Sequence, residues 1–268
     1  MAVYSKYTSA LNYRTLISVL ISVVATWLSY KYDLRFNLDL TLISVAVVFP
    51  LVFTLGSAFQ RRDKALEHLS RAKAALATIY YSFTQAKEMP EKTKENIYDN
   101  IKKLKLDLIE FLSSNSNDRT KLNQSISQIK TMVEQHRESL GRSLSLRVYR
   151  YMRDVLMGLE NTIAIKFHRT PQSIRAYCEL FIYVFPFYYA PTLMYNIETG
   201  SNEILNSSGE IFYSTIASGT HHPFVVYGLN MIISFILISL FNVQEQIEDP
   251  FDNEGLDDVM LDMYKLDY

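Results

Sequence analysis

Apolar residues along the chain gather into four blocks that are separated by polar stretches. The blocks cover residues 16–30, 40–59, 177–195 and 223–243. A helix that crosses a bilayer needs about 20 apolar residues, with a range of roughly 17–25. The last three blocks meet this length, and the shorter first block has aromatic residues at its ends that favour interfacial anchoring. These residues are Tyr13, Trp27, Tyr30 and Tyr32. The pattern therefore predicts four membrane-spanning helices.

The first block has a second interpretation, because a cleaved signal peptide also contains a short apolar segment. No small-residue cleavage pattern follows the block, and the stretch from Lys31 to Arg35 is a poor cleavage site. We therefore expect residues 16–30 to be retained as a membrane helix.

Residues 60–175 have the pattern of water-exposed helices. Apolar residues recur every three or four positions in three runs, which is the spacing of one helix face. Pro90 ends the first run, and the serine- and asparagine-rich residues 113–118 predict a loop before the third. The third run is either an ordinary core stripe or a coiled-coil seam to another subunit. The runs are Leu66, Leu69, Leu76, Ile79 and Phe83; Ile97, Ile101, Leu104, Leu108, Phe111 and Leu112; and Leu122, Ile126, Ile129, Val133, His136, Leu140, Leu144 and Val148.

Charge divides the chain more sharply than hydropathy does. Residues 1–59 hold 4 basic and 2 acidic residues, residues 60–175 hold 22 and 13, and residues 176–268 hold 1 and 13. A basic excess is typical of the cytoplasmic side of a membrane protein. We therefore expect residues 60–175 and both termini on the cytoplasmic side, or its equivalent, of a multi-pass protein.

This reasoning predicts four consecutive regions. Residues 1–59 hold the first two membrane helices, and residues 60–175 form a cytoplasmic helical region. Residues 176–243 hold the third and fourth membrane helices with an outward loop at 196–222, and residues 244–268 form an acidic cytoplasmic tail. The mean hydropathy of zero over 268 residues excludes both a disordered chain and a bundle that lies wholly within the membrane.

The sequence lacks the common patterns of enzyme chemistry. It has no Gly-rich phosphate loop and no His-Glu-x-x-His motif. The single cysteine, Cys178, lies in an apolar block, which indicates a buried structural thiol. The basic residues of 60–175 are interleaved with acidic ones, which favours a solvated surface over a nucleic-acid site. We predict that the protein is not an enzyme and binds no nucleic acid.

Val45, Phe49 and Phe53 follow one another at a spacing of four within the second apolar block. This spacing stacks them on one face of a helix, where they face lipid or neighbouring helices, or a symmetry axis. Around an axis they would form three apolar rings and hence a hydrophobic constriction. The positive edges of phenyl rings tolerate an anion better than a cation.

Acidic residues concentrate directly after the last apolar block, where nine of residues 244–268 are Asp or Glu. An acidic tail is commonly solvated. Pro250 and Phe251 within it, however, imply an ordered turn with a buried aromatic ring. We expect this segment to pack as a belt against the basic cytoplasmic helices, with some acids paired to basic residues.

These features resemble the bestrophins, a family of pentameric anion channels, and are closest to its bacterial and plant-type members. Residues 248–252 are similar to the acidic Pro-Phe signature that follows the last bestrophin membrane helix. An arginine eight residues after the last neck residue and the Thr170-Pro171 pair before the third block also match. The matching neck and motif residues are Val45, Phe49, Phe53, Arg61, Glu248, Asp249, Pro250 and Phe251.

The resemblance implies an all-α membrane protein with four transmembrane helices and a cytoplasmic helical bundle in each subunit. It implies a homopentamer in a lipid bilayer, with one central pore that conducts chloride and similar small monovalent anions passively. Val45, Phe49 and Phe53 would form the neck of that pore.

By position, the resemblance also implies calcium ligands in the acidic tail. The matching residues are Gln246, Asp249, Glu254 and Asp257. Asn253, Gly255 and Leu256 interrupt the acidic run there, so we expect calcium to bind weakly or not at all. The sequence indicates no other cofactor.

Two other functions fit the membrane pattern. One is a non-conducting membrane scaffold whose cytoplasmic helices bind partners, although a scaffold has no need of a stacked neck face. The other is a proton-coupled transporter that uses Glu179 near the start of the third block. Because Glu179 lies close enough to the block's end to reach the interface, the channel interpretation is preferred.

Overall fold

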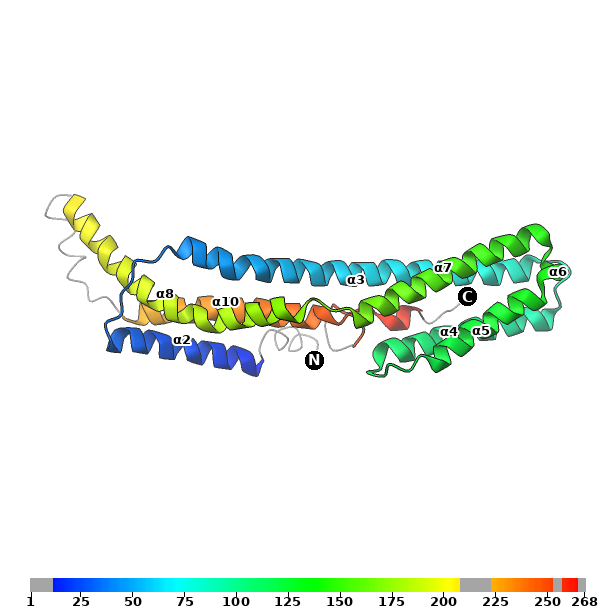
Figure 1. Cartoon of the computed structure of the whole chain (residues 1–268), viewed down its shortest axis with the longest axis horizontal. Coiled ribbons are helices and arrows are strands. Elements are labelled where there is room, and N and C mark those ends of the chain that lie inside the picture. The colour runs from blue at the N-terminus through cyan, green and yellow to red at the C-terminus, as the bar shows by residue number, and fades with distance from the viewer. Residues whose placement is uncertain (1–11, 208–222, 253–256, 265–268) are drawn as a thin grey trace. The chain divides into compact units, whose positions relative to one another are not determined.

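The structure, a computed structural model, describes residues 12–207, 223–252 and 257–264, and every regular element in these ranges is a helix (Figure 1). The helices are α2 (Tyr13–Lys31), α3 (Leu40–Gln85), α4 (Glu91–Ser113), α5 (Thr120–Gln135), α6 (Arg137–Leu140), α7 (Arg142–Phe167), α8 (Gln172–Ser207) and α10 (Pro223–Glu248), followed by the short 3₁₀ helix η1 (Leu261–Tyr264). The all-α fold class expected from the sequence is therefore correct for the described residues.

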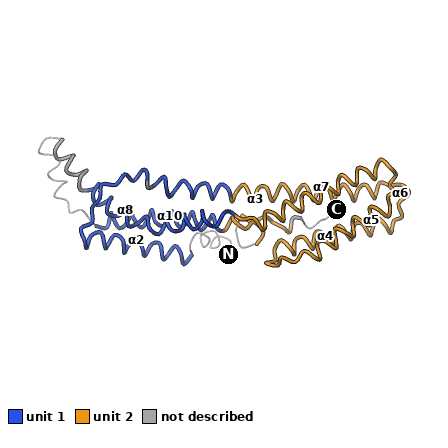
Figure 2. Tube along the Cα trace, in the orientation of Figure 1, with its two compact units in different colours: residues 1–57, 170–245 blue, residues 58–169, 246–268 orange. Residues whose placement is uncertain are grey.

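The helices form two compact units (Figure 2). Unit 1 contains residues 1–57 and 170–245, and unit 2 contains residues 58–169 and 246–268. The long helix α3 contributes to both units, because the division between the units after Ser57 lies within this helix. Each unit is thus assembled from segments that are far apart in the sequence.

Among the described residues, three helices are long and apolar enough to cross a membrane. They are α2, α3 and α10. Helix α8 contains the third block expected from the sequence, but its tyrosines and two internal prolines, Pro186 and Pro191, reduce its apolar character. Three of the four expected spans are therefore found by length and composition.

Helix α2 packs in unit 1 through small polar residues. Asn12 caps it by accepting the Tyr13 N–H at 2.7 Å. Within the unit, Asn230 of α10 donates to the Ser22 carbonyl at 3.1 Å and to the Thr26 hydroxyl at 2.9 Å. Such interhelical hydrogen bonds and small side chains hold helices together where lipid removes the hydrophobic driving force.

Unit 2 has an apolar core that the helical stripes of the sequence predict closely. Pro90 directly precedes α4 and occupies its N-cap position, as its fixed backbone angle favours. The α4 face predicted from the sequence is buried throughout, and so are most members of the first stripe. The fully enclosed members of both include Leu69, Ile79, Phe83, Ile97, Ile101 and Leu104.

The third stripe differs from a single continuous helix. The chain leaves the helix at His136 and again at Gly141, whose φ of +74° is a conformation that side chains with a Cβ rarely adopt. The stripe is therefore divided among α5, α6 and α7. Its buried members, including Leu122, Ile129 and Val148, join the core of unit 2, which supports the ordinary core interpretation.

The expected outward loop at 196–222 also begins later than predicted. Helix α8 continues to Ser207, and residues 208–222 lie outside the described part of the chain. Hydropathy marks where apolar side chains end, but polar residues can extend a helix beyond that point. For the same reason α10 extends past the apolar block to Glu248.

Candidate functional site

The membrane part of α3 has two apolar faces with different surroundings. Val47 and Leu51 are buried against Cys178 and Ile182 of α8 in the core of unit 1. Cys178 is a free, buried thiol, as its position in the sequence predicts. This face attaches α3 to the rest of unit 1 and leaves the opposite face open.

The open face carries the three predicted neck residues. Val45, Phe49 and Phe53 are 55%, 59% and 61% exposed within the single chain. The rings of Phe49 and Phe53 meet edge to face, with centroids 4.4 Å apart. The structure thus brings the three residues together on one surface that is free within the chain.

The last residues of α10 belong to unit 2, where a buried ion pair holds them. Glu248, the last residue of the helix, is 2% exposed and its carboxylate accepts a hydrogen bond from Arg61. Arg61 also donates to the carbonyl of Ile165 at 2.7 Å. A buried carboxylate of this kind requires such a partner, because an unpaired buried charge is strongly unfavourable.

The Pro-Phe turn follows directly. Asp249 pairs with Arg169 at 2.5 Å and accepts the Phe251 N–H at 3.3 Å. The Pro250 carbonyl accepts the Val259 N–H at 2.9 Å, which closes the turn. Phe251 is fully buried in the core of unit 2. The described residues of the tail therefore form an ordered belt in which some acids, Glu248 and Asp249 among them, pair with basic residues, as the sequence suggests.

The structure describes three of the four candidate calcium ligands, Gln246, Asp249 and Asp257. The Asp249 carboxylate is paired with Arg169, and the Asp257 carbonyl accepts a hydrogen bond from Arg62. Glu254 lies outside the described residues. Within the described ranges, no group of three or more His, Cys, Asp or Glu side chains is arranged to hold a metal ion.

A second charged cluster lies in unit 1 and was not predicted from the sequence. Glu245 of α10 accepts hydrogen bonds from Arg14 and Arg175 at 2.6 Å each. Arg14 also lies 4.0 Å from Glu179. The cluster joins the first turns of α2 and α8 to the last turn of α10. The only signal in the sequence is that these charges flank or enter apolar blocks, where ionised groups usually pair.

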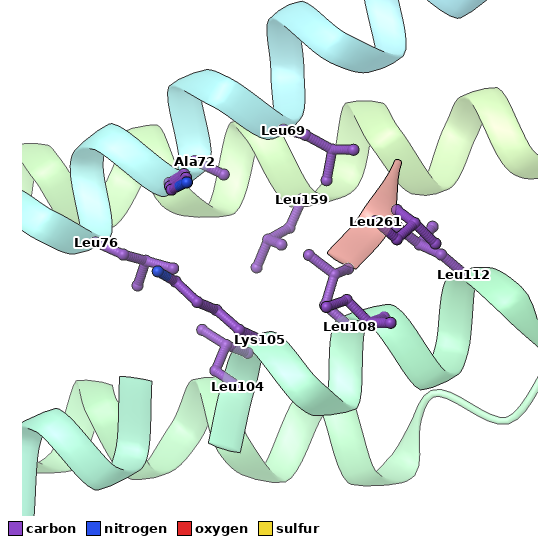
Figure 3. Close-up of a pocket in the computed structure, with 11 residues that line it drawn as sticks. Leu69, Ala72, Leu76, Leu104, Lys105, Leu108, Leu112, Leu159 and Leu261 are labelled. Atoms are coloured by element: carbon purple, nitrogen blue, oxygen red, sulfur yellow. The ribbon is translucent and has the colours of Figure 1, made fainter. Parts of the chain in front are cut away.

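Unit 2 also contains a buried lysine that is not part of the predicted apolar runs. Lys105 of α4 is 5% exposed and lies among leucines of α3, α4, α7 and η1, beside Lys73 (Figure 3). Burial, and then the charge of Lys73, lower the pKa of Lys105 to about 7. The surrounding space is about 20 Å³, enough for one water molecule. The sequence indicates this burial only through the position of Lys105, which is four residues after Ile101 on the buried face of the helix.

Comparisons with known proteins agree with this architecture. No protein-family model matches the sequence, and no curated protein matches it. Solved structures do match. A bacterial bestrophin homolog from Klebsiella pneumoniae is 15% identical with a TM-score of 0.71, and the match covers 94% of this chain and 93% of that one. A single-residue variant of the homolog is 14% identical, with the same TM-score and 94% of both chains covered.

These findings define the chain first as an integral membrane protein that is all-helical in its described residues, with helices long and apolar enough to cross a bilayer. Its fold is that of the bacterial bestrophin homologs, over nearly the whole length of both chains. The resemblance found in the sequence is therefore confirmed at the level of the fold.

Proposed function

We propose that this protein is the subunit of a bestrophin-like anion channel that conducts chloride passively through a central pore. The observation that carries the proposal is the open α3 face of Val45, Phe49 and Phe53, on a chain with the bestrophin fold. In a monomer these stacked phenyl rings would face lipid. A ring of subunits gives them a common axis.

The proposed assembly is a homopentamer in a lipid bilayer. Five copies of the face would form three apolar rings about 6 Å apart, because a helix rises about 1.5 Å per residue. Such a neck closes by dewetting and passes weakly hydrated anions along the ring edges. The number five comes from the family resemblance, and the closed ring comes from a heterologous interface.

The proposed topology has four spans, with α8 as the third, and both termini on the cytoplasmic side. Unit 2 would then lie in the cytoplasm, where the basic excess of residues 60–175 raises the local concentration of small monovalent anions. Calcium is not required in this proposal, because Asp249 is already paired with Arg169. The proposal includes no enzymatic activity, no cofactor and no nucleic-acid partner.

The experiment is a chloride flux assay with purified protein in liposomes, combined with a mass measurement in detergent that is corrected for the bound micelle. We expect a pentamer that releases chloride, with the same rate at low and high calcium. A pentamer that conducts no anion would favour the scaffold interpretation, and a monomer or dimer would contradict the neck. Flux that needs a proton gradient would favour the transporter.

A further inference from the structure

The neck segment of α3 contains a proline, which removes one hydrogen bond from the helix. In an α-helix the N–H of residue 50 would donate to the carbonyl of residue 46, four positions earlier. Pro50 has no N–H, so the Ala46 carbonyl loses its helical donor. Within a membrane a backbone carbonyl without a donor is costly, so such groups recruit one from a neighbouring helix.

The replacement donor comes from α8. The hydroxyl of Tyr177 donates to the Ala46 carbonyl across 3.4 Å, within unit 1. The Tyr177 ring lies against Phe181, one turn further along α8, with ring centroids 4.3 Å apart. Val47 and Leu51, on either side of Pro50, pack in the same core as Cys178 and Ile182. The two helices are therefore held side by side where the hydroxyl reaches the carbonyl.

The surroundings of this hydrogen bond leave room for it to break. Pro50, Phe53 and Thr54 of α3 and Tyr177 of α8 line one open pocket of about 630 Å³. The bond is also long, and Tyr177 is partly exposed. This hydrogen bond joins α8 to the α3 segment before Pro50, which carries Val45 and Phe49. Phe53 lies in the segment after the proline.

We propose that Tyr177 is a positioning residue for the neck, whose hydroxyl replaces the donor that Pro50 removes and so holds the first half of the neck in its closed position. This inference rests on the proposed channel function. When the bond breaks, the segment before Pro50 is free to tilt against the segment after it, because a proline is where a helix bends. The constriction formed by Phe49 and Phe53 then widens.

The test is a double-mutant cycle on Tyr177 and Pro50. Tyr177→Phe removes only the hydroxyl and keeps the ring against Phe181. We expect it to raise chloride flux from liposomes about two- to tenfold, the range that corresponds to one hydrogen bond. Pro50→Ala restores the N–H that bonds to Ala46. In that background the hydroxyl is redundant, so adding Tyr177→Phe should leave the flux unchanged.

Tyr188→Phe is the matched control, because Tyr188 is an exposed tyrosine of the same helix. It should leave the flux at the wild-type value, and all variants should keep the wild-type mass in detergent. An unchanged or reduced flux in Tyr177→Phe would overturn the inference. So would an increase that persists in the Pro50→Ala background, because the hydroxyl would then act elsewhere.

A second measurement separates this inference from the channel function. If the wild-type protein conducts no chloride, the proposed function fails, but the same cycle can be measured by thermal unfolding in detergent. Tyr177→Phe should lower the melting temperature in the Pro50 background and leave it unchanged in the Pro50→Ala background. Equal effects in both backgrounds would contradict the link between Tyr177 and Pro50.

Discussion

The two units differ in the side chains that their helices bury. The core of unit 2 consists mainly of large apolar residues such as Phe83 and Ile97, and most of its lysines and glutamates lie outside this core. In unit 1, α2 buries Ser18 and Ser22 and leaves Leu16 and Leu20 exposed. Water drives apolar side chains inward, whereas a bilayer leaves them outside and rewards polar contacts between helices. The two units are thus packed as these two solvents favour, and α3 contributes residues to both units.

The largest expected effect is in the core of unit 2. Phe251→Ala should lower the free energy of unfolding by about 3–5 kcal/mol, the usual result of removing a buried phenyl ring. Denaturant unfolding of the purified protein measures this loss. Met260→Ala in the same belt is the control, because Met260 is 65% exposed and should change little. Equal losses in the two variants would show that the belt is not packed as described.

A close helix crossing in unit 2 gives the next effect. A Cβ at Gly158 of α7 would lie 2.8 Å from the His68 carbonyl of α3, so the backbone would have to shift. Gly158→Ala should therefore lower the free energy of unfolding by about 1–3 kcal/mol. A Cβ at Gly228 of unit 1 meets nothing within 4 Å. Gly228→Ala should be neutral or stabilising by up to about 1 kcal/mol, and the reverse order would contradict the packing.

The buried lysine gives unit 2 a dependence on pH. The pKa of Lys105 is lowered to about 7 in the folded protein, whereas in the unfolded chain it is near the ordinary lysine value. Between these values the unfolded chain binds the extra proton, so stability rises with pH by up to about 1.4 kcal/mol per pH unit and is lost as the pH falls towards 7. Lys105→Met should abolish this slope between pH 7 and 9. Lys102 is an exposed lysine on the same helix, so the Lys102→Met variant should keep the pH dependence of stability.

The smallest effect concerns the polar contacts of unit 1. Asn230→Ala removes the hydrogen bonds to Ser22 and Thr26. It should lower the free energy of unfolding by about 0.6 kcal/mol, the average for a hydrogen bond between membrane helices, and by at most about 1.7 kcal/mol. The control is Ile232→Ala, which shortens an exposed side chain of the same helix. Thermal unfolding in detergent compares the two. A larger loss in Ile232→Ala would contradict the view that unit 1 is held by its polar contacts.

The spacing of apolar residues predicts the buried helix faces in the unit whose surface has the pattern of contact with water. It predicted the buried faces of α4 and the first stripe, because water allows only one side of such helices to be apolar. It did not predict the breaks at His136 and Gly141, since the stripe continues across them. It also missed the polar face of α2, because a membrane helix is apolar enough overall to hide a row of serines and threonines.

The candidate site was predicted in part. A spacing of four is sufficient to place Val45, Phe49 and Phe53 on one face, and a Pro-Phe pair indicates a turn that buries Phe251. The partners of these residues could not be predicted. Arg61 pairs with Glu248, 187 residues away, and Tyr177 meets Ala46 across 131 residues. Such pairings depend on tertiary packing, to which local spacing gives no access.

The central claim is that the open face of α3 lines a pore. The most direct measurement is the chloride flux of liposomes that contain the Phe49→Ala, Phe53→Ala double variant, at equal protein content and with the wild-type mass in detergent. If the rings form the constriction, their removal widens the neck, and the flux should rise well above that of the wild type. Flux equal to that of the wild type, from a normally folded and assembled variant, would contradict the account and assign these residues to the lipid-facing surface.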